Sequence, residues 1–127
     1  QLEATWALTN VASGTTIQCQ SIIDKGGIPL FVDLLRSNNL GIVEQAIWAI
    51  GNISSDCVFY RDTIIRAGGL VNLVDATKRL SDEALIKHCC WALSNLCRGN
   101  PLPKYDSIKY AIPILCAAIA QGKINDK

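Results

Sequence analysis

Apolar residues recur along most of this chain with a period of about 3.6 residues, which is the spacing that places them on one face of a helix. No stretch shows the strict alternation of apolar and polar residues expected of a half-buried strand. Glycine or proline interrupts the pattern at residues 25–29, 66–70 and 109–113. Glycine can close a helix, and proline is tolerated in the first turn of the next one. The pattern therefore predicts an all-α chain whose helices are separated by tight breaks.

The predicted helices fall into three groups that recur in the same order. A short first helix is expected at residues 17–25, 59–66 and 105–109, and a second follows directly at 28–36, 70–78 and 112–120. A longer third helix is expected at 1–12, 41–53 and 82–97. Asn38, Asn39 and Gly41 mark the loop before its second copy, and Ser81 and Asp82 supply capping residues before its third. One three-helix unit is thus repeated along the chain.

The third helix repeats a sequence phrase as well as a position. The phrases Trp6-Ala-Leu-Thr-Asn10, Trp48-Ala-Ile-Gly-Asn52 and Trp91-Ala-Leu-Ser-Asn95 follow one another at intervals of 42 and 43 residues. Helical repeats of about 40–47 residues are typical of armadillo and HEAT solenoids. We therefore predict a right-handed armadillo-repeat solenoid with three-helix repeats of about 42 residues. Because residue 1 already lies inside a helical phrase, we expect the array to be truncated at both ends.

The repeat divides the chain into parts of a single armadillo-repeat fragment, residues 1–127. We expect residues 1–14 to be the third helix of a first repeat and residues 15–56 to be the second repeat. Residues 57–99 would then form the third repeat, and residues 100–127 the start of a fourth.

The third helix has two faces of different character. One is wide and apolar, and we expect it to pack against neighbouring helices; it comprises Ala4, Ala7, Leu8 and Val11 in the first copy, Ala46, Ile47, Ala49, Ile50 and Ile53 in the second, and Cys89, Cys90, Ala92, Leu93 and Leu96 in the third. The other face carries a tryptophan and an asparagine in every copy. We call these six residues, Trp6, Asn10, Trp48, Asn52, Trp91 and Asn95, the Trp–Asn stripe.

The recurrence of the stripe favours a binding surface. A single tryptophan on an amphipathic helix is more often a core residue, and a buried asparagine needs partners for its amide. Three copies of both residues favour a surface that binds a ligand with repeating polar groups. An internal asparagine ladder that bridges adjacent repeats is the alternative, and it remains open.

An extended polypeptide is the common ligand that fits such a surface. It advances about 3.3 Å per residue, and each asparagine amide can donate to a peptide carbonyl and accept from a peptide N–H. Two neighbouring tryptophans would form a slot for the stem of a lysine or arginine, with its cation over an aromatic face. Glu3, Glu44 and Asp56 lie near the stripe, with Gln45 as a neutral acceptor. The expected ligand is therefore a basic segment, whereas a methyl-lysine cage would close around one ammonium group.

Composition and charge argue against other classes of partner. Half of the residues are hydrophobic, 18% are charged and the net charge is +1, so we expect no direct nucleic-acid binding. The sequence contains no run of about 18 apolar residues that could span a bilayer, and its first residues do not show the cationic-then-apolar pattern that suggests secretion. The six cysteines form no CxxC pair, so we expect them to be buried small hydrophobes in a reducing cytosolic or nuclear compartment.

The phrases of the third helix resemble a known family. Residues 3–14, 44–56 and 91–98 are similar to the second, third and fourth armadillo repeats of importin-α (karyopherin-α), and the resemblance covers essentially the whole chain. It implies a fragment of a nuclear import adaptor that binds basic nuclear-localisation signals of cargo proteins in a concave groove, the major site. It also implies that importin-β is bound through a segment absent from this chain, and that the protein occurs in the cytoplasm and nucleus.

The resemblance also implies roles for individual residues. Trp6, Trp48 and Trp91 would form the lysine slots, and Asn10, Asn52 and Asn95 would hold the peptide backbone. The Gly14 carbonyl and the Asp56 carboxylate match the positions that take the deepest-bound lysine, and Ser13 and Gln45 match further peptide contacts. Two residues depart from the family: Cys19 stands where a threonine is usual, and His88 replaces a frequent asparagine, which would add pH sensitivity.

Three other interpretations fit the sequence less well. An armadillo scaffold of the β-catenin type typically binds acidic partners in a basic groove, but here the equivalent helix carries only Arg98. A structural array without a peptide groove leaves the repeated asparagines unexplained. An enzyme or metal site would rest on His88, Cys89, Cys90 and Cys97, but adjacent helical residues point in different directions. No phosphate-binding loop or catalytic triad context is present. We therefore expect no catalysis, no cofactor and no metal.

Overall fold

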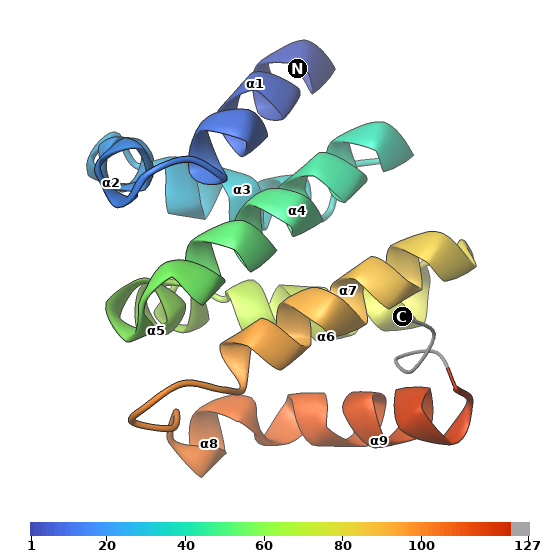
Figure 1. Ribbon diagram of the computed structural model, residues 1–127. Helices are drawn as coiled ribbons and strands as arrows, with labels where there is room; N and C mark the ends of the chain where they lie inside the picture. Colours follow the sequence, from blue (N-terminus) through green and yellow to red (C-terminus); the bar gives the residue numbers. More distant parts are fainter. Residues whose placement is uncertain (123–127) are drawn as a thin grey trace.

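The computed structural model describes residues 1–122, and all of the regular elements in that range are helical (Figure 1). The elements are α1 (Leu2–Ala12), α2 (Thr16–Asp24), α3 (Gly27–Leu34), α4 (Leu40–Asp56), α5 (Val58–Arg66), α6 (Gly69–Arg79), α7 (Glu83–Leu96), α8 (Tyr105–Ile108), the 3-10 helix η1 (Lys109–Ala111) and α9 (Ile112–Ala120). Every predicted helix is present, with its ends within three residues of those expected. The all-α prediction is confirmed.

The helices are arranged as a stack of similar units. The longest helix, α4, packs against α1 on one side and α7 on the other, and Figure 1 shows these three in one layer that faces the viewer. Helices α3 and α6 lie behind this layer, and α2, α5 and α8 lie along one edge of it. The layer of α1, α4 and α7 carries the whole Trp–Asn stripe.

Glycine pairs make the sharp corners between the first and second helices of two units. Gly26 and Gly68 adopt positive φ angles of 78° and 91°, a left-handed conformation that favours glycine. The residues that follow them lack space for a side chain. A Cβ atom would lie 2.3 Å from Ile22 Cγ2 at Gly27, and 2.4 Å from Ile64 Cγ2 at Gly69. The close approach of the helices at these corners therefore requires both glycines of each pair.

Side-chain caps are present at the N-termini of α2, α4 and α7. Asn39 Oδ1 accepts hydrogen bonds from the backbone N–H groups of Gly41 and Ile42, and Asp82 accepts one from Leu85. Thr15 forms a reciprocal capping box with Gln18 at the start of α2. These caps fix the residues at which α2, α4 and α7 begin.

The core runs continuously from one unit to the next. On α4 and α7 the predicted apolar face is buried as expected: Ala46, Ile47, Ala49, Ile50 and Ile53 on α4, and Cys89, Cys90, Ala92, Leu93 and Leu96 on α7. On α1 the prediction is wrong, because Ala4, Ala7, Leu8 and Val11 are exposed. Thr5, Thr9 and Ala12 are buried there instead. The reason is that α1 is the outermost helix of this stack, so only the side that faces α2 and α4 is covered.

A buried arginine organises the loop between α7 and α8. The Arg61 side chain is only 2% exposed, and its Nη1 donates to the carbonyls of Arg98 (3.0 Å) and Pro101 (2.7 Å). Its Nε donates to Asp62 Oδ1 at 2.9 Å. A buried charge is tolerated only when it is paired in this way. Arg61 thus ties the end of one unit to the start of the next.

Candidate functional site

The tryptophans of the stripe are accessible to different degrees. Trp6 on α1 is 57% exposed, Trp48 on α4 is 36% exposed, and Trp91 on α7 is partly buried against the core. Asn10, Ser13, Gly14 and Asp56 are exposed on the same units, and Gln45 and Asn52 are partly exposed. Most of the predicted site residues therefore remain available to a ligand.

The rings of the stripe are not evenly spaced. Trp48 lies against Trp91 with 4.9 Å between ring centroids and an interplanar angle of 51°. An aliphatic stem inserted between two rings needs them about 7–8 Å apart, since carbon atoms in contact are about 3.5–4.0 Å apart. The predicted slot between Trp48 and Trp91 is therefore closed in this arrangement. No ring contact of Trp6 is found within residues 1–122, so the slot on the other side of Trp48 is not closed in this way.

A glycine that the sequence analysis did not single out supports the Trp91 ring. A Cβ atom at Gly51 would lie 2.1 Å from Cζ3 and 2.5 Å from Cη2 of that ring. The indole of α7 therefore lies directly against the backbone of α4. The available signal was a glycine inside a long helix, where it is unfavourable by about 1 kcal/mol relative to alanine.

The three asparagines differ in what they bind. Asn95 is only 2% exposed; its Nδ2 donates to the Gly51 carbonyl on α4 at 3.1 Å, and its Oδ1 accepts from Arg98 Nη2 at 2.5 Å. At Asn95 the stripe therefore forms the internal asparagine bridge between adjacent repeats. For Asn10 and Asn52, no side-chain hydrogen bond is found within the range that the structure describes. Their amides therefore remain available for a peptide backbone.

A polar cluster surrounds the end of α4. Thr16 Oγ1 donates to Asp56 Oδ1 at 3.3 Å, so the hydroxyl beside Asp56 comes from residue 16, which the sequence analysis did not identify. Cys19 is buried nearby. Burial, with smaller contributions from the Asp56 carboxylate and the Cys57 thiol, raises the pKa of the Cys19 thiol to about 11. Cys19 is therefore a neutral thiol at physiological pH.

The remaining cysteines only partly follow the prediction. Cys19, Cys89 and Cys90 are buried as expected, but Cys57 and Cys116 are exposed and Cys97 is partly exposed. Burial raises the pKa of Cys89 to about 12, and it also raises that of Cys97. Among the residues that the structure describes, no group of three His, Cys, Asp or Glu side chains could hold a metal ion. None of the helices described is long and apolar enough to span a membrane.

Comparison with known proteins identifies both the repeat and its relatives. The model of the armadillo/beta-catenin-like repeat matches residues 16–55. Importin subunit alpha-4 of Arabidopsis thaliana is 51% identical over 115 residues, which cover 91% of this chain and 21% of that protein. Importin subunit alpha-7 of the same species is 49% identical over 127 residues, which cover 100% of this chain and 24% of that protein. Importin subunit alpha-1a of Oryza sativa subsp. japonica is 40% identical over 119 residues, which cover 94% of this chain and 23% of that protein.

Solved structures match at the level of the fold. A designed armadillo repeat protein in complex with the peptide (KR)4 superposes with a TM-score of 0.78 and 28% identity, covering 99% of this chain and 51% of that one. An engineered protein superposes with a TM-score of 0.83 and 29% identity, covering 98% of this chain and 31% of that one. The armadillo-repeat prediction and the resemblance to importin-α are confirmed. The chain spans less than a quarter of the length of these curated relatives, all of which are named importin subunit alpha.

Proposed function

We propose that this chain, an armadillo-repeat segment similar over nearly its whole length to importin-α, is the peptide-binding part of a nuclear import adaptor. Its ligand would be the extended lysine- and arginine-rich nuclear-localisation signal of cargo proteins. The observation that carries the proposal is the exposed side of the stripe, where Trp6 and Trp48 stand beside the unbonded amides of Asn10 and Asn52. The protein would act in both the cytoplasm and the nucleus, and contact importin-β through a segment outside this chain.

Charge favours the α1 and α4 end of the stripe for the deepest-bound lysine. Glu3 and Asp56 are exposed there, and Glu44 is partly exposed. The basic side chain of Arg98 lies at the α7 end, where it is bonded to Asn95. An ammonium group at Asp56 would pair with that carboxylate, while its methylene stem lies along the side of Trp6 and Trp48. Glu3 and Glu44, near the opposite ends of α1 and α4, would attract other basic residues of the peptide.

The two available asparagines suit the geometry of an extended backbone. Helices pack about 8–10 Å apart, and two residues of an extended peptide advance about 6.6–7 Å. Asn10 and Asn52 occupy equivalent positions on the adjacent helices α1 and α4. Each amide can bond one peptide unit through both its donor and its acceptor without reading the side chains. Specificity would then come from the tryptophans and Asp56.

Peptide titration with a charge-reversal variant tests the proposal. A labelled lysine-rich peptide should bind, whereas acidic and uncharged peptides of the same length should not. Asp56→Lys should lower affinity about ten- to a hundredfold, because a hydrogen bond to a charged group is worth about 1.5–3 kcal/mol and about 1.4 kcal/mol is tenfold. The matched control is Asp75→Lys, the same charge change at an exposed site on α6. Equal affinity of Asp56→Lys and the native chain would refute the assigned site.

A further inference from the structure

The chain's single histidine lies against Trp48 of the stripe. His88 is on α7, three residues before Trp91, and its ring lies 4.9 Å from the Trp48 ring at an angle of 49°. Its Nδ1 atom is 3.7 Å from Glu44 Oε2, between side chains that are 28% and 42% exposed. That nitrogen is buried and has no hydrogen-bond partner among the described residues. The imidazole therefore lies between the Glu44 carboxylate and the Trp48 ring, both of which are on α4.

We propose that His88 sets the charge of the peptide-binding site and thereby regulates its affinity for basic peptides. When protonated, His88 forms an ion pair with Glu44 and places a positive charge beside the Trp48 ring. That charge repels the peptide's lysine at the ring and neutralises the Glu44 carboxylate, which would otherwise attract a basic peptide. When neutral, His88 adds no charge beside the ring and leaves the charge of Glu44 uncompensated. The inference rests on the proposed function, because the regulated ligand is the basic peptide.

The geometry favours this effect for two reasons. The Nδ1 atom has no hydrogen-bond partner among the described residues and lies 3.7 Å from Glu44 Oε2, which is within ion-pairing distance when the imidazole carries a proton. A cation over the face of a tryptophan is attracted by the ring, whether it belongs to a side chain of the protein or to a ligand.

The other charged groups around α7 are occupied elsewhere. On α4 the charged residues are Glu44 and Asp56, and Asp56 lies at the far end of the helix, where it is bonded to Thr16. On α5, Arg61 is bonded to the carbonyls of Arg98 and Pro101, and Asp62 is bonded to Arg61. The third charged residue of α5, Arg66, donates to Thr63 on its own helix.

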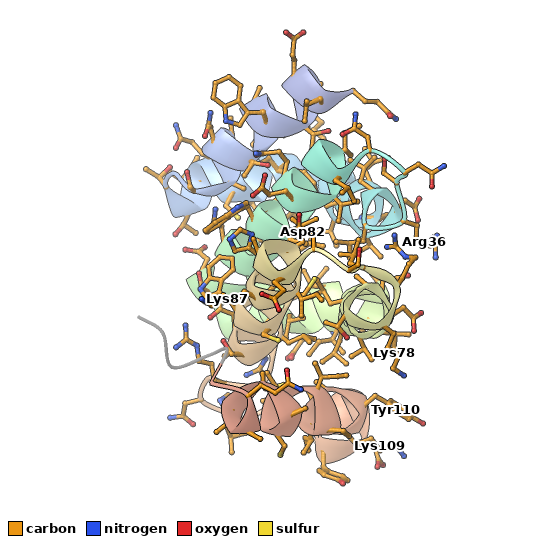
Figure 2. The ribbon with its side chains drawn as sticks, turned by 90° about the vertical axis from the view of Figure 1, so that its right-hand side faces the viewer. Arg36, Lys78, Asp82, Lys87, Lys109 and Tyr110 are labelled. Atoms are coloured by element: carbon orange, nitrogen blue, oxygen red, sulfur yellow. The ribbon has the colours of Figure 1, made fainter. Side chains whose placement is uncertain are left out.

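The charged groups of α6 lie away from the stripe, and α9 carries none. On α6, Arg79 donates to the Leu35 carbonyl, and Asp75 and Lys78 line the outer seam with α9, which carries no charged residue of its own. In Figure 2, Lys78 lies with Arg36 and Lys109 on one side of the molecule, and Lys87 of α7 lies toward the opposite side. Glu44 thus lies within ion-pairing distance of His88, and Lys87 precedes His88 on α7.

The expected effect follows from the competing interactions. A cation–π contact at an exposed site is worth about 0.5–1 kcal/mol, which corresponds to roughly a two- to fivefold change in affinity. Histidine is the side chain that ordinarily changes charge between pH 5 and 8, whereas exposed carboxylates and lysines keep their charges at pH 5.5. Affinity for a basic peptide should therefore be about two- to fivefold weaker at pH 5.5 than at pH 7.5.

Calorimetric titration at the two pH values tests the proposal with one substitution. The peptide should contain lysine and neutral residues only, so that its own charge is constant. The ratio of affinities at pH 7.5 and pH 5.5 should be about two to five for the native chain and close to one for His88→Asn. Equal ratios in the two proteins would overturn the role of His88. Failure of the peptide to bind at either pH would overturn the proposed function itself.

Nuclear magnetic resonance supplies a readout that a purely structural role would not change. Because the chain contains one histidine, its imidazole resonances are assigned without ambiguity. Coupling between two binding events is reciprocal, so if protonation weakens peptide binding, bound peptide must disfavour protonation by the same factor. Saturating lysine-rich peptide should move the titration midpoint of these resonances to lower pH by about 0.3–0.7 unit, the logarithm of that factor. An unchanged midpoint would overturn the inference.

Discussion

Replacing Gly51 with alanine tests the close contact between α4 and the Trp91 ring. The added Cβ would lie 2.1, 2.5 and 2.8 Å from three atoms of the indole. Carbon atoms in contact are about 3.5–4.0 Å apart, so the ring has to move by about 1.5 Å. Because three ring atoms are too close, the whole indole must swing away from α4. Its contact with Trp48, now 4.9 Å between centroids, would be lost with it.

Two opposing effects set the size of the change in stability. Alanine is favoured over glycine inside a helix by about 1 kcal/mol. Overpacking a well-packed site costs about 1–3 kcal/mol. The free energy of unfolding should therefore fall by about 0–2 kcal/mol, whereas an unobstructed glycine in the same helix would show the full gain. Peptide affinity should change as well, because the Trp48 ring loses the support of Trp91.

Urea unfolding followed by far-ultraviolet circular dichroism gives the stability, and peptide titration gives the affinity. Gly41→Ala is the matched control on α4, since its added Cβ would come no closer than 3.2 Å to another residue, at Asn39 Oδ1. The control should be near neutral or slightly stabilised, and its peptide affinity should match that of the native chain. A Gly51→Ala chain that is about 1 kcal/mol more stable than native, with unchanged affinity, would refute the reasoning.

Two further predictions concern the neighbours of the stripe. Asn95→Ala should lower the free energy of unfolding by about 1–3 kcal/mol, measured by urea titration, because the Gly51 carbonyl and the Arg98 guanidinium both lose a partner; a neutral effect would show that Asn95 forms no bridge in solution. The raised pKa of Cys19 means that folding favours its protonated thiol, so the contribution of this thiol to the free energy of unfolding should be constant below pH 9 and fall as pH rises toward 11. Cys19→Ala should reduce that fall, and an identical pH profile for the variant would contradict the burial of this thiol as its cause.

Local patterns were enough to predict the helices, since their signals lie within a few residues of the positions they control. Apolar periodicity, the Gly26-Gly27 and Gly68-Gly69 pairs and the caps at Asn39 and Asp82 all act within one or two turns. The recurrence of the Trp–Asn phrase was likewise sufficient to predict the armadillo stack. The assignment of peptide-binding roles to the stripe was also made from the sequence, and it stays a prediction.

Contacts between repeats were not predictable in the same way. The same Trp–Asn phrase gives an exposed Trp6 and Asn10 on α1 but a partly buried Trp91 and a bonded Asn95 on α7. The phrase determines on which face of its helix a side chain lies. The adjacent helix determines which residues that side chain contacts.

Sequence pattern thus established the type and order of the helices, the repeat and the composition of the stripe, because each of these depends on neighbours along the chain. Tertiary packing alone closed the slot between Trp48 and Trp91, placed Thr16 at Asp56 and brought His88 to Glu44. Each of these pairs is separated by about one repeat, so its distance depends on how one unit sits on the next. Whether a side chain of the stripe lines a binding slot or bridges two repeats therefore depends on how the repeats stack. The sequence pattern of a single helix contains no information about that stacking.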